Sequence, residues 1–156
     1  MTDSDREGLV KVFFQLEDAP TATESMWAEP MEDGRFRLRN SPFYAFGVSF
    51  LDVVYANEAA DGGREFAGVA ERGGHSTYRV ILEEGVTRAS FEKKLEDLRR
   101  LGCNYECGTH VFFVIDLPPS SDIYAVYKVL EEGQAEGLWE FEEAHVGHEL
   151  RKPIGP

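Results

Sequence analysis

The residues best suited to chemistry stand together in the stretch RGGHSTYR, residues 72–79. A glycine pair precedes His75 and Ser76 there, and a base beside a hydroxyl is what a serine nucleophile requires. Residues 76–84, however, alternate apolar and polar side chains as a strand does, and neighbouring strand residues point to opposite faces. No G-x-S-x-G elbow occurs, and the glycines open a strand rather than a phosphate-binding helix. We therefore expect no catalytic residue here, but a sharp turn across which His75 makes a hydrogen bond.

Two further groups contain side chains of the types that bind metals. One is His145, His148 and Glu149; the other is Cys103, Cys107 and His110. The paired histidines fall three apart in a predicted strand, where they diverge, and the cysteines lack the C-x-x-C spacing of a zinc knuckle. The sequence therefore predicts neither a metal nor a cofactor, and both cysteines are expected to be reduced.

Asp52 stands at the start of an apolar strand, where a carboxylate commonly accepts backbone N–H bonds. No second carboxylate is paired with it by spacing, so a structural role is favoured over catalysis. The alternative is a ligand pocket at the junction of two folding units, because pockets commonly form at such interfaces. In that case Asp52, His75, Ser76 and Arg79 would be the polar residues that converge on the ligand.

Aromatic side chains are concentrated in the first half of the chain, and most of them are expected to pack in a core. Flanking arginines would also suit a platform on which nucleic-acid bases stack, but the surrounding acidic residues oppose that use. Aromatic residues with arginine are the usual anchors of protein interfaces. We therefore predict a partner-binding patch that includes Trp27, Phe43, Tyr44 and Arg37.

The elements that position these residues fall into two groups, and the fold class predicted is α+β. Residues 9–74 contain about five short strands with turns and no helix, near 9–17, 25–40, 50–58 and 64–71. This pattern predicts a small antiparallel β-barrel of the SH3-like or OB-like kind. Residues 75–148 follow the order β-α-β-β-α-β, with one helix at 87–102 and a second that begins at 120–122, which is the ferredoxin-like order. The termini, 1–8 and 149–156, are expected to be loose.

The charge of the chain restricts its partners. Sixteen Lys and Arg residues stand against 29 Asp and Glu residues, a net charge of −13. Residues 1–75 carry 14 acidic and 7 basic side chains and residues 76–156 carry 15 and 9, so the acid is not confined to a tail. Such a surface repels phosphate, which disfavours nucleic acid and membranes and favours a basic protein partner. Without an apolar run of about 18 residues or a secretory signal, the chain is expected to be cytoplasmic.

Two stretches carry a family resemblance: SMWAEPMEDGRFRLRNSPFYAFGVSFLDVVYA, residues 25–56, and VAERGGHSTYRVIL, residues 69–82. They resemble the uncharacterised bacterial family called domain of unknown function 4265. The matching positions are Trp27, Asn40, Pro42, Phe43, Gly47, Asp52, Gly74, His75, Ser76 and Arg79. The resemblance implies a bacterial cytoplasmic setting and no particular activity. In element order and acidity the second half is also similar to the ferredoxin-like regulators that inhibit ribonuclease E.

Two hypotheses of different kinds follow from the sequence. The first is a non-catalytic acidic protein that docks on a basic protein partner, as an immunity protein or a regulator of a nuclease does. The alternative is a small-ligand sensor or enzyme with its pocket at the junction of the two halves. Exposed edges of a four-stranded sheet make a homodimer a further expectation.

Overall fold

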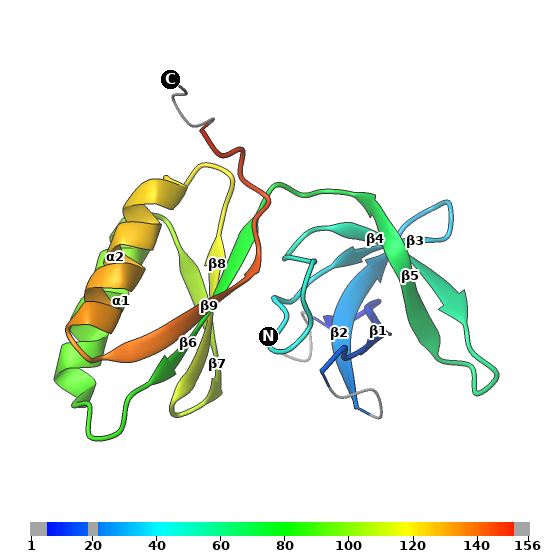
Figure 1. Ribbon diagram of the computed structural model, residues 1–156. Coiled ribbons are helices and arrows are strands. Elements are labelled where there is room, and N and C mark those ends of the chain that lie inside the picture. The colour runs from blue at the N-terminus through cyan, green and yellow to red at the C-terminus, as the bar shows by residue number, and fades with distance from the viewer. Residues whose placement is uncertain (1–5, 19–21, 152–156) are drawn as a thin grey trace.

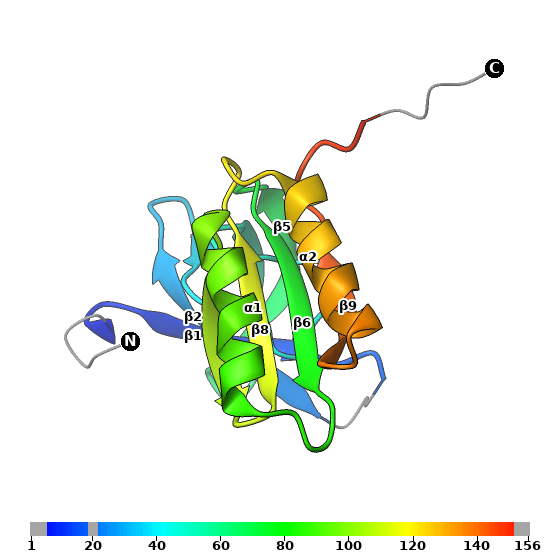
Figure 2. The same ribbon diagram turned by 90° about the vertical axis from the view of Figure 1, so that its left-hand side faces the viewer.

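The computed structural model of the chain describes residues 6–18 and 22–151. Over these residues the chain forms nine strands and two helices, arranged as two sheets that lie beside one another (Figure 1). The mixed α+β class predicted from the sequence is confirmed, and strands predominate. Helices cover only the second sheet, on the face turned away from the first sheet (Figures 1 and 2).

The first sheet contains five consecutive strands: β1 Val10–Gln15, β2 Thr23–Pro30, β3 Arg35–Leu38, β4 Val53–Glu58 and β5 Arg64–Glu71. Successive strands pair antiparallel, and β1 meets β5 through a single parallel pair, Phe13 with Glu65. The sheet therefore curls until its first strand touches its last. In an up-and-down series of five strands the first and fifth necessarily run in the same direction. The small antiparallel barrel expected from the sequence is shown as far as the antiparallel pairing of its successive strands, and the single contact between β1 and β5 is parallel.

Alternation along these strands builds the core of the first sheet. Val12 and Phe14 of β1 and Met26 and Ala28 of β2 point inward, and their neighbours in sequence point outward. Asp33 and Gly34 lie in the turn between β2 and β3, where Gly34 has the positive φ of 77° that glycine tolerates. Residues 41–50, which we call the aromatic loop, then lead from β3 toward β4.

The second sheet and its two helices follow in chain order: β6 Ser76–Leu82, α1 Arg88–Arg100, β7 Asn104–Thr109, β8 Phe112–Leu117, α2 Ile123–Ala135 and β9 Trp139–His145. In space the strands lie in the order β7-β8-β6-β9, and every adjacent pair is antiparallel. Thr87 caps α1 by accepting the N–H of Ser90, and Asp122 caps α2. Both helix starts agree with the sequence-based expectation.

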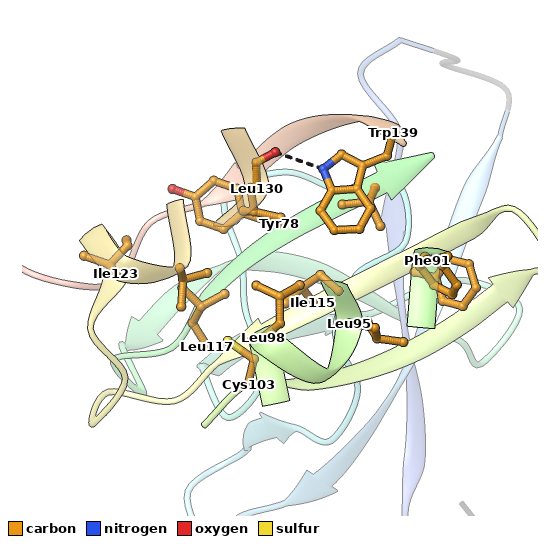
Figure 3. Packing of buried hydrophobic residues seen from close by; sticks show 13 residues of the cluster. Tyr78, Phe91, Leu95, Leu98, Cys103, Ile115, Leu117, Ile123, Leu130 and Trp139 are labelled. Atoms are coloured by element: carbon orange, nitrogen blue, oxygen red, sulfur yellow. Dashed lines mark hydrogen bonds between the residues drawn. The ribbon is translucent and has the colours of Figure 1, made fainter. Parts of the chain in front are cut away.

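One face of this sheet packs against the helices, as Figure 3 shows. Leu95 and Leu98 of α1 and Leu130 of α2 lie in one buried cluster with Ile115 and Leu117 of β8. The indole N–H of Trp139 donates to the Leu130 carbonyl at 2.9 Å, so the largest buried side chain leaves no unpaired donor. Tyr127 of α2 is 41% exposed, and its ring contacts Tyr78 and Phe141.

Each sheet has its own hydrophobic core, and residues 72–75 connect β5 of the first sheet to β6 of the second. Whether 9–74 and 75–148 are independent domains stays a prediction. The expectation of loose termini falls mainly on residues 1–5 and 152–156, which lie outside the described residues. At the end of the described part, the Arg151 N–H donates to the Tyr124 hydroxyl at 2.5 Å. Within the described ranges, neither helix is long and apolar enough to cross a membrane.

Candidate functional site

The glycine pair forms the turn that carries the chain from one sheet to the other. Gly74 has a φ of 87°, and a Cβ on Gly73 would lie 2.8 Å from the backbone of Leu51. The turn brings His75 and Ser76 into the contact zone between the sheets. We call this zone the seam; it comprises residues 41–52, 72–79 and 142–148.

His75 and Ser76 diverge at the seam, as the strand argument requires. The His75 Nδ1 lies 2.8 Å from a carboxylate oxygen of Asp116, and the Ser76 hydroxyl lies 2.6 Å from Nδ1 of His148. His148 Nε2 donates to the Pro118 carbonyl at 3.0 Å, so its Nδ1 accepts the proton of the Ser76 hydroxyl. The Ser76 oxygen also accepts the backbone N–H groups of Gly147 and His148, and it is fully buried. This serine therefore holds the chain segment after β9 in place, and although His148 lies within reach of its hydroxyl, the full burial of Ser76 closes it to a substrate.

Asp52 is fully buried and accepts backbone N–H groups at a strand entry. Its carboxylate accepts from Ser49 at 2.9 Å and Gly73 at 2.8 Å, and it pairs with the Arg72 guanidinium at 3.1 Å. The Ser49 hydroxyl continues the network to Thr77 at 2.6 Å and to Nδ1 of His145 at 2.9 Å. Burial, with the nearby charge of Arg72, lowers the pKa of His145 below its ordinary value. The network ties the first sheet to the second.

Arg79 is the charged residue at the centre of the seam and is only 1% exposed. Its Nε donates to Glu142 at 2.7 Å, and its Nη1 donates to the carbonyls of Ala45 and Pro42 at 2.9 and 3.4 Å. Its guanidinium carbon lies 4.5 Å from the centre of the Phe46 ring. Arg79 thus fastens the aromatic loop to the second sheet.

Glu24 on β2 fastens the same loop from the other side. Its carboxylate accepts three consecutive backbone N–H groups, from Phe43 at 2.6 Å, Tyr44 at 3.1 Å and Ala45 at 2.8 Å. Nothing in the sequence marked this residue, because a single glutamate 19 to 21 positions before its partners has no local pattern. The loop is consequently held by side chains from both sheets, with its aromatic rings directed by a fixed backbone.

Between the loop and the two sheets lies a cavity of about 490 Å³, which we call the aromatic cleft. Its lining residues are Phe14, Gln15, Leu16, Glu17, Asp18, Phe43, Tyr44, Ala45, Phe46, Phe66, Ile81, Phe112 and Glu142. Three of them are large apolar side chains that water reaches freely: Tyr44 is 58% exposed, Ile81 53% and Phe46 47%. A second cavity of about 200 Å³, lined also by Arg79 and Glu140, shares Ile81, Phe112 and Glu142 with it.

The charged side chains that line the aromatic cleft are all acidic, and the Arg79 guanidinium adjoins it behind Phe46 and Glu142. Among its described lining residues, Glu17, Asp18 and Glu142 are acidic and none is basic. The Oε1 atom of Glu142 is occupied by Arg79, and Oε2 accepts no hydrogen bond from the described part of the chain. Exposed aromatic rings beside carboxylates form a surface that attracts cations.

The structure separates the residues predicted from the sequence. Asp52, His75, Ser76 and Arg79 all lie at the seam, but their hydrogen bonds run within the chain and they do not line the aromatic cleft. Phe43 and Tyr44 do line it. Trp27 lies elsewhere, on β2, with the Lys11 ammonium 5.0 Å from its ring centre, and Arg37 pairs with Glu29 at 3.8 Å.

Ile81 and Phe112 were not singled out from the sequence, although a signal existed. Each is a large apolar residue whose neighbours in the strand already face the helices. Val80 and Leu82 flank Ile81 and belong to the core beneath the helices, and Phe113 does the same beside Phe112. Cross-strand pairing places Ile81 directly opposite Phe112. An apolar residue on the second face of a strand indicates that this face is also covered or binds something.

The described residues contain no group of three or more His, Cys, Asp or Glu side chains that could hold a metal ion. His145 and His148 are separated by their different hydrogen-bond partners, Ser49 and Ser76. Both cysteines are free, with Cys103 buried and Cys107 exposed. Burial raises the pKa of the Cys103 thiol to about 12, so this residue serves as a small apolar side chain.

Residues 24–141 match the family model described as "Domain of unknown function (DUF4265)". The chain belongs to this family. The resemblance seen in the sequence is thereby confirmed. The aromatic residues of the cleft from Phe43 to Phe112 lie inside the DUF4265 match, whereas Glu17, Asp18 and Glu142 lie just outside it.

Among solved structures, the DUF4265 chain is similar to one described as "Novel crystal structure of a hypothetical protein from Neisseria gonorrhoeae". The TM-score is 0.75 at 16% sequence identity, over 90% of this chain and 95% of that chain. At that identity the likeness shows a shared fold alone. No curated protein matches the sequence.

Proposed function

We propose that the protein is a non-catalytic, acidic binding protein of the cytoplasm that docks on a basic protein partner, as an immunity protein or a nuclease regulator does. The observation that carries this proposal is the aromatic cleft, in which exposed rings and carboxylates meet without a basic lining residue among those described. Aromatic rings supply the apolar contact of an interface, and a net charge of −13 accelerates encounter with a positively charged protein.

The seam supports binding rather than chemistry. Apart from Arg79 Nη2, the buried polar side-chain atoms described above are hydrogen-bonded to one another or to backbone groups, so they fix the geometry of the aromatic loop and leave its outward rings available. A rigid surface loses little conformational entropy when it binds, which favours a docking role.

We also propose that the two halves are a small barrel and a ferredoxin-like unit. In support of the second, the chain order β6-α1-β7-β8-α2-β9 is combined with the spatial order β7-β8-β6-β9, so the first and third strands are central and both helices lie on one face. In support of the first, β1 reaches β5 at Phe13.

The test is capture of partners from a bacterial lysate by the tagged full chain, with mass spectrometry of what is bound. We expect a basic protein to be captured at about 50 mM salt and largely lost at about 500 mM, because exposed charges are screened over shorter distances at high salt. A variant that neutralises the acids near the cleft, Glu17→Gln/Asp18→Asn/Glu140→Gln, should lose the partner. The matched control neutralises three exposed acids elsewhere, Glu58→Gln/Glu65→Gln/Glu131→Gln.

Capture that neither salt nor either variant alters would refute docking by charge. If both variants lose the captured partner equally, the protein docks through its acidic surface, but the interface is not at the aromatic cleft. The predicted homodimer is checked in the same preparations by light scattering, since β7 is an edge strand with mostly exposed residues.

A small-ligand sensor remains a second candidate because of one observation. The volume of the aromatic cleft, about 490 Å³, falls within the range of about 300–1,000 Å³ typical of ligand pockets. A small molecule released on denaturing the purified protein, and lost from the Tyr44→Ala variant, would support this candidate over a protein partner.

A further inference from the structure

We propose that the aromatic cleft binds an arginine side chain of the partner, with the guanidinium stacked on exposed rings and hydrogen-bonded to the carboxylates beside them. This inference rests on the proposed function and gives its interface a chemical specificity. Four features of the cleft support it: the apolar lining, the charge of the lining, the fixed position of the loop and an internal example of the same contact.

The apolar part of the cleft accounts for stacking. Tyr44 lies 5.7 Å from Phe112, centre to centre, and Phe43 lies 5.8 Å from Phe112, so the three rings form a connected group. Tyr44 and Phe46 are exposed at its surface. A planar guanidinium is weakly hydrated and stacks on such rings, whereas an ammonium keeps a tight hydration shell.

The carboxylates account for the charge of the occupant. An uncharged apolar side chain in the cleft would displace water from Glu142 and its acidic neighbours without replacing the lost hydrogen bonds, which is unfavourable. A guanidinium compensates them, because its five N–H groups are spaced to bind carboxylates in pairs. Glu142 retains Oε2 for this purpose, and Glu17 and Asp18 are exposed.

The molecule already contains this contact in internal form. Arg79 places its guanidinium carbon 4.5 Å from the centre of the Phe46 ring while its Nε binds Glu142 at 2.7 Å. The same ring and the same carboxylate line the aromatic cleft. Ring and carboxylate are therefore at a separation that a single guanidinium spans.

The loop is held in this arrangement before any ligand arrives. Glu24 binds three successive N–H groups of the loop and Arg79 binds two of its carbonyls. Ring positions are consequently set by buried hydrogen bonds, and a ligand does not have to order them. This feature favours recognition of one defined side chain over a general acidic attraction.

The direct test uses three blocked tripeptides, acetyl-Gly-X-Gly-amide with X as arginine, lysine or citrulline, titrated into the full chain and followed by amide NMR. Citrulline has the shape of arginine without its charge. We expect saturable shifts at the aromatic loop with arginine, affinity at least about tenfold weaker with citrulline, and an intermediate affinity with lysine. Equal binding of citrulline and arginine, or shifts that map outside the cleft, would overturn the assignment.

Variants separate stacking from general surface effects. Tyr44→Leu keeps an apolar side chain but removes the ring, and we expect the arginine peptide to bind about three- to tenfold more weakly. Tyr55→Leu is the matched control, because Tyr55 is 50% exposed on β4 and does not line the cleft. The loop backbone is held through Tyr44 N–H, which the substitution retains. Equal loss in both variants, or no loss in Tyr44→Leu, would contradict a stacked guanidinium.

The two proposals fail in different ways. If a basic partner is captured equally well by Tyr44→Leu and by the unaltered chain, the docking function stands and the arginine site is wrong. If the arginine peptide binds but no basic protein is captured, the cleft is a site for a cationic small molecule and the docking function is wrong.

Discussion

Replacing Glu24 by glutamine tests whether the aromatic loop is held as the structure indicates. The substitution keeps the size of the side chain and removes its charge. In the unaltered protein one oxygen accepts the Phe43 N–H at 2.6 Å, and the other accepts Tyr44 and Ala45 at 3.1 and 2.8 Å. Glutamine has only one acceptor oxygen, so at least one loop N–H would meet an amide donor instead.

The expected cost follows from those three bonds. A hydrogen bond to a charged group contributes about 1.5–3 kcal/mol and one between neutral groups about 1 kcal/mol. Losing one bond to the carboxylate and weakening the other two should destabilise the protein by roughly 2–4 kcal/mol, partly offset because a neutral amide is less costly to bury. For a chain of this length a loss of about 3 kcal/mol lowers Tm by roughly 6–12 °C.

Urea unfolding of Glu24→Gln beside Glu58→Gln measures this cost. The control removes one exposed acidic charge from the same strongly acidic chain and should change the free energy of unfolding by less than about 0.5 kcal/mol. The midpoint should fall in Glu24→Gln with an unchanged slope. A difference between the two variants below about 0.5 kcal/mol would refute the idea that the Glu24 carboxylate secures the loop. Binding of the arginine tripeptide should weaken in parallel, because the rings would lose their fixed backbone.

Three further outcomes are expected. Gly133→Ala should destabilise the protein by about 1–3 kcal/mol in thermal unfolding, because the added Cβ would overlap the buried ring of Trp139. Alanine has a higher helix propensity than glycine, but that gain of about 1 kcal/mol is smaller than the cost of the overlap. A more stable variant would contradict this packing. Because burial lowers the pKa of His145 below its usual 6.5, the unfolded chain takes up the proton first as the pH falls. The stability contributed by this group is complete above pH 6.5 and is lost at lower pH. In a series of unfolding measurements across pH, His145→Gln should flatten that part of the stability curve. A thiol reagent should label exposed Cys107 in the native protein and buried Cys103, whose pKa is raised to about 12, only after unfolding; two rapid labels per native chain would be the contrary result.

Local elements could be predicted from the sequence because their causes are local. The helix that begins near residue 87 and the strand near 9–17 each depend on residues a few positions apart, and both agree with the structure. Divergence of His75 from Ser76 was likewise predictable, because strand geometry alone determines it.

Features that depend on residues far apart in the chain could not be predicted from the sequence. Glu24 acts through N–H groups about 20 positions away, and a single acidic residue has no periodicity that identifies its role. The aromatic cleft combines the end of β1 with Ile81 and Phe112 of the other sheet, so it exists only after both halves have folded and met. The sequence identified His75 and Ser76 as polar residues at the junction. It could not show their hydrogen-bond partners, because Asp116 and His148 approach them only in the folded state.

The aromatic loop should behave energetically as one unit, because its two anchors act on the same few residues. Glu24 binds the Ala45 N–H at 2.8 Å and Arg79 binds the Ala45 carbonyl at 2.9 Å. If either anchor is removed the loop loosens, and the remaining anchor then holds a segment that is no longer in its native place. The double variant Glu24→Gln/Arg79→Met should therefore be less destabilised than the sum of the single variants, by at least about 0.5 kcal/mol, as expected for residues that share a partner. Strict additivity would mean that the anchors act independently and that the rings of the cleft are not positioned jointly by the two sheets.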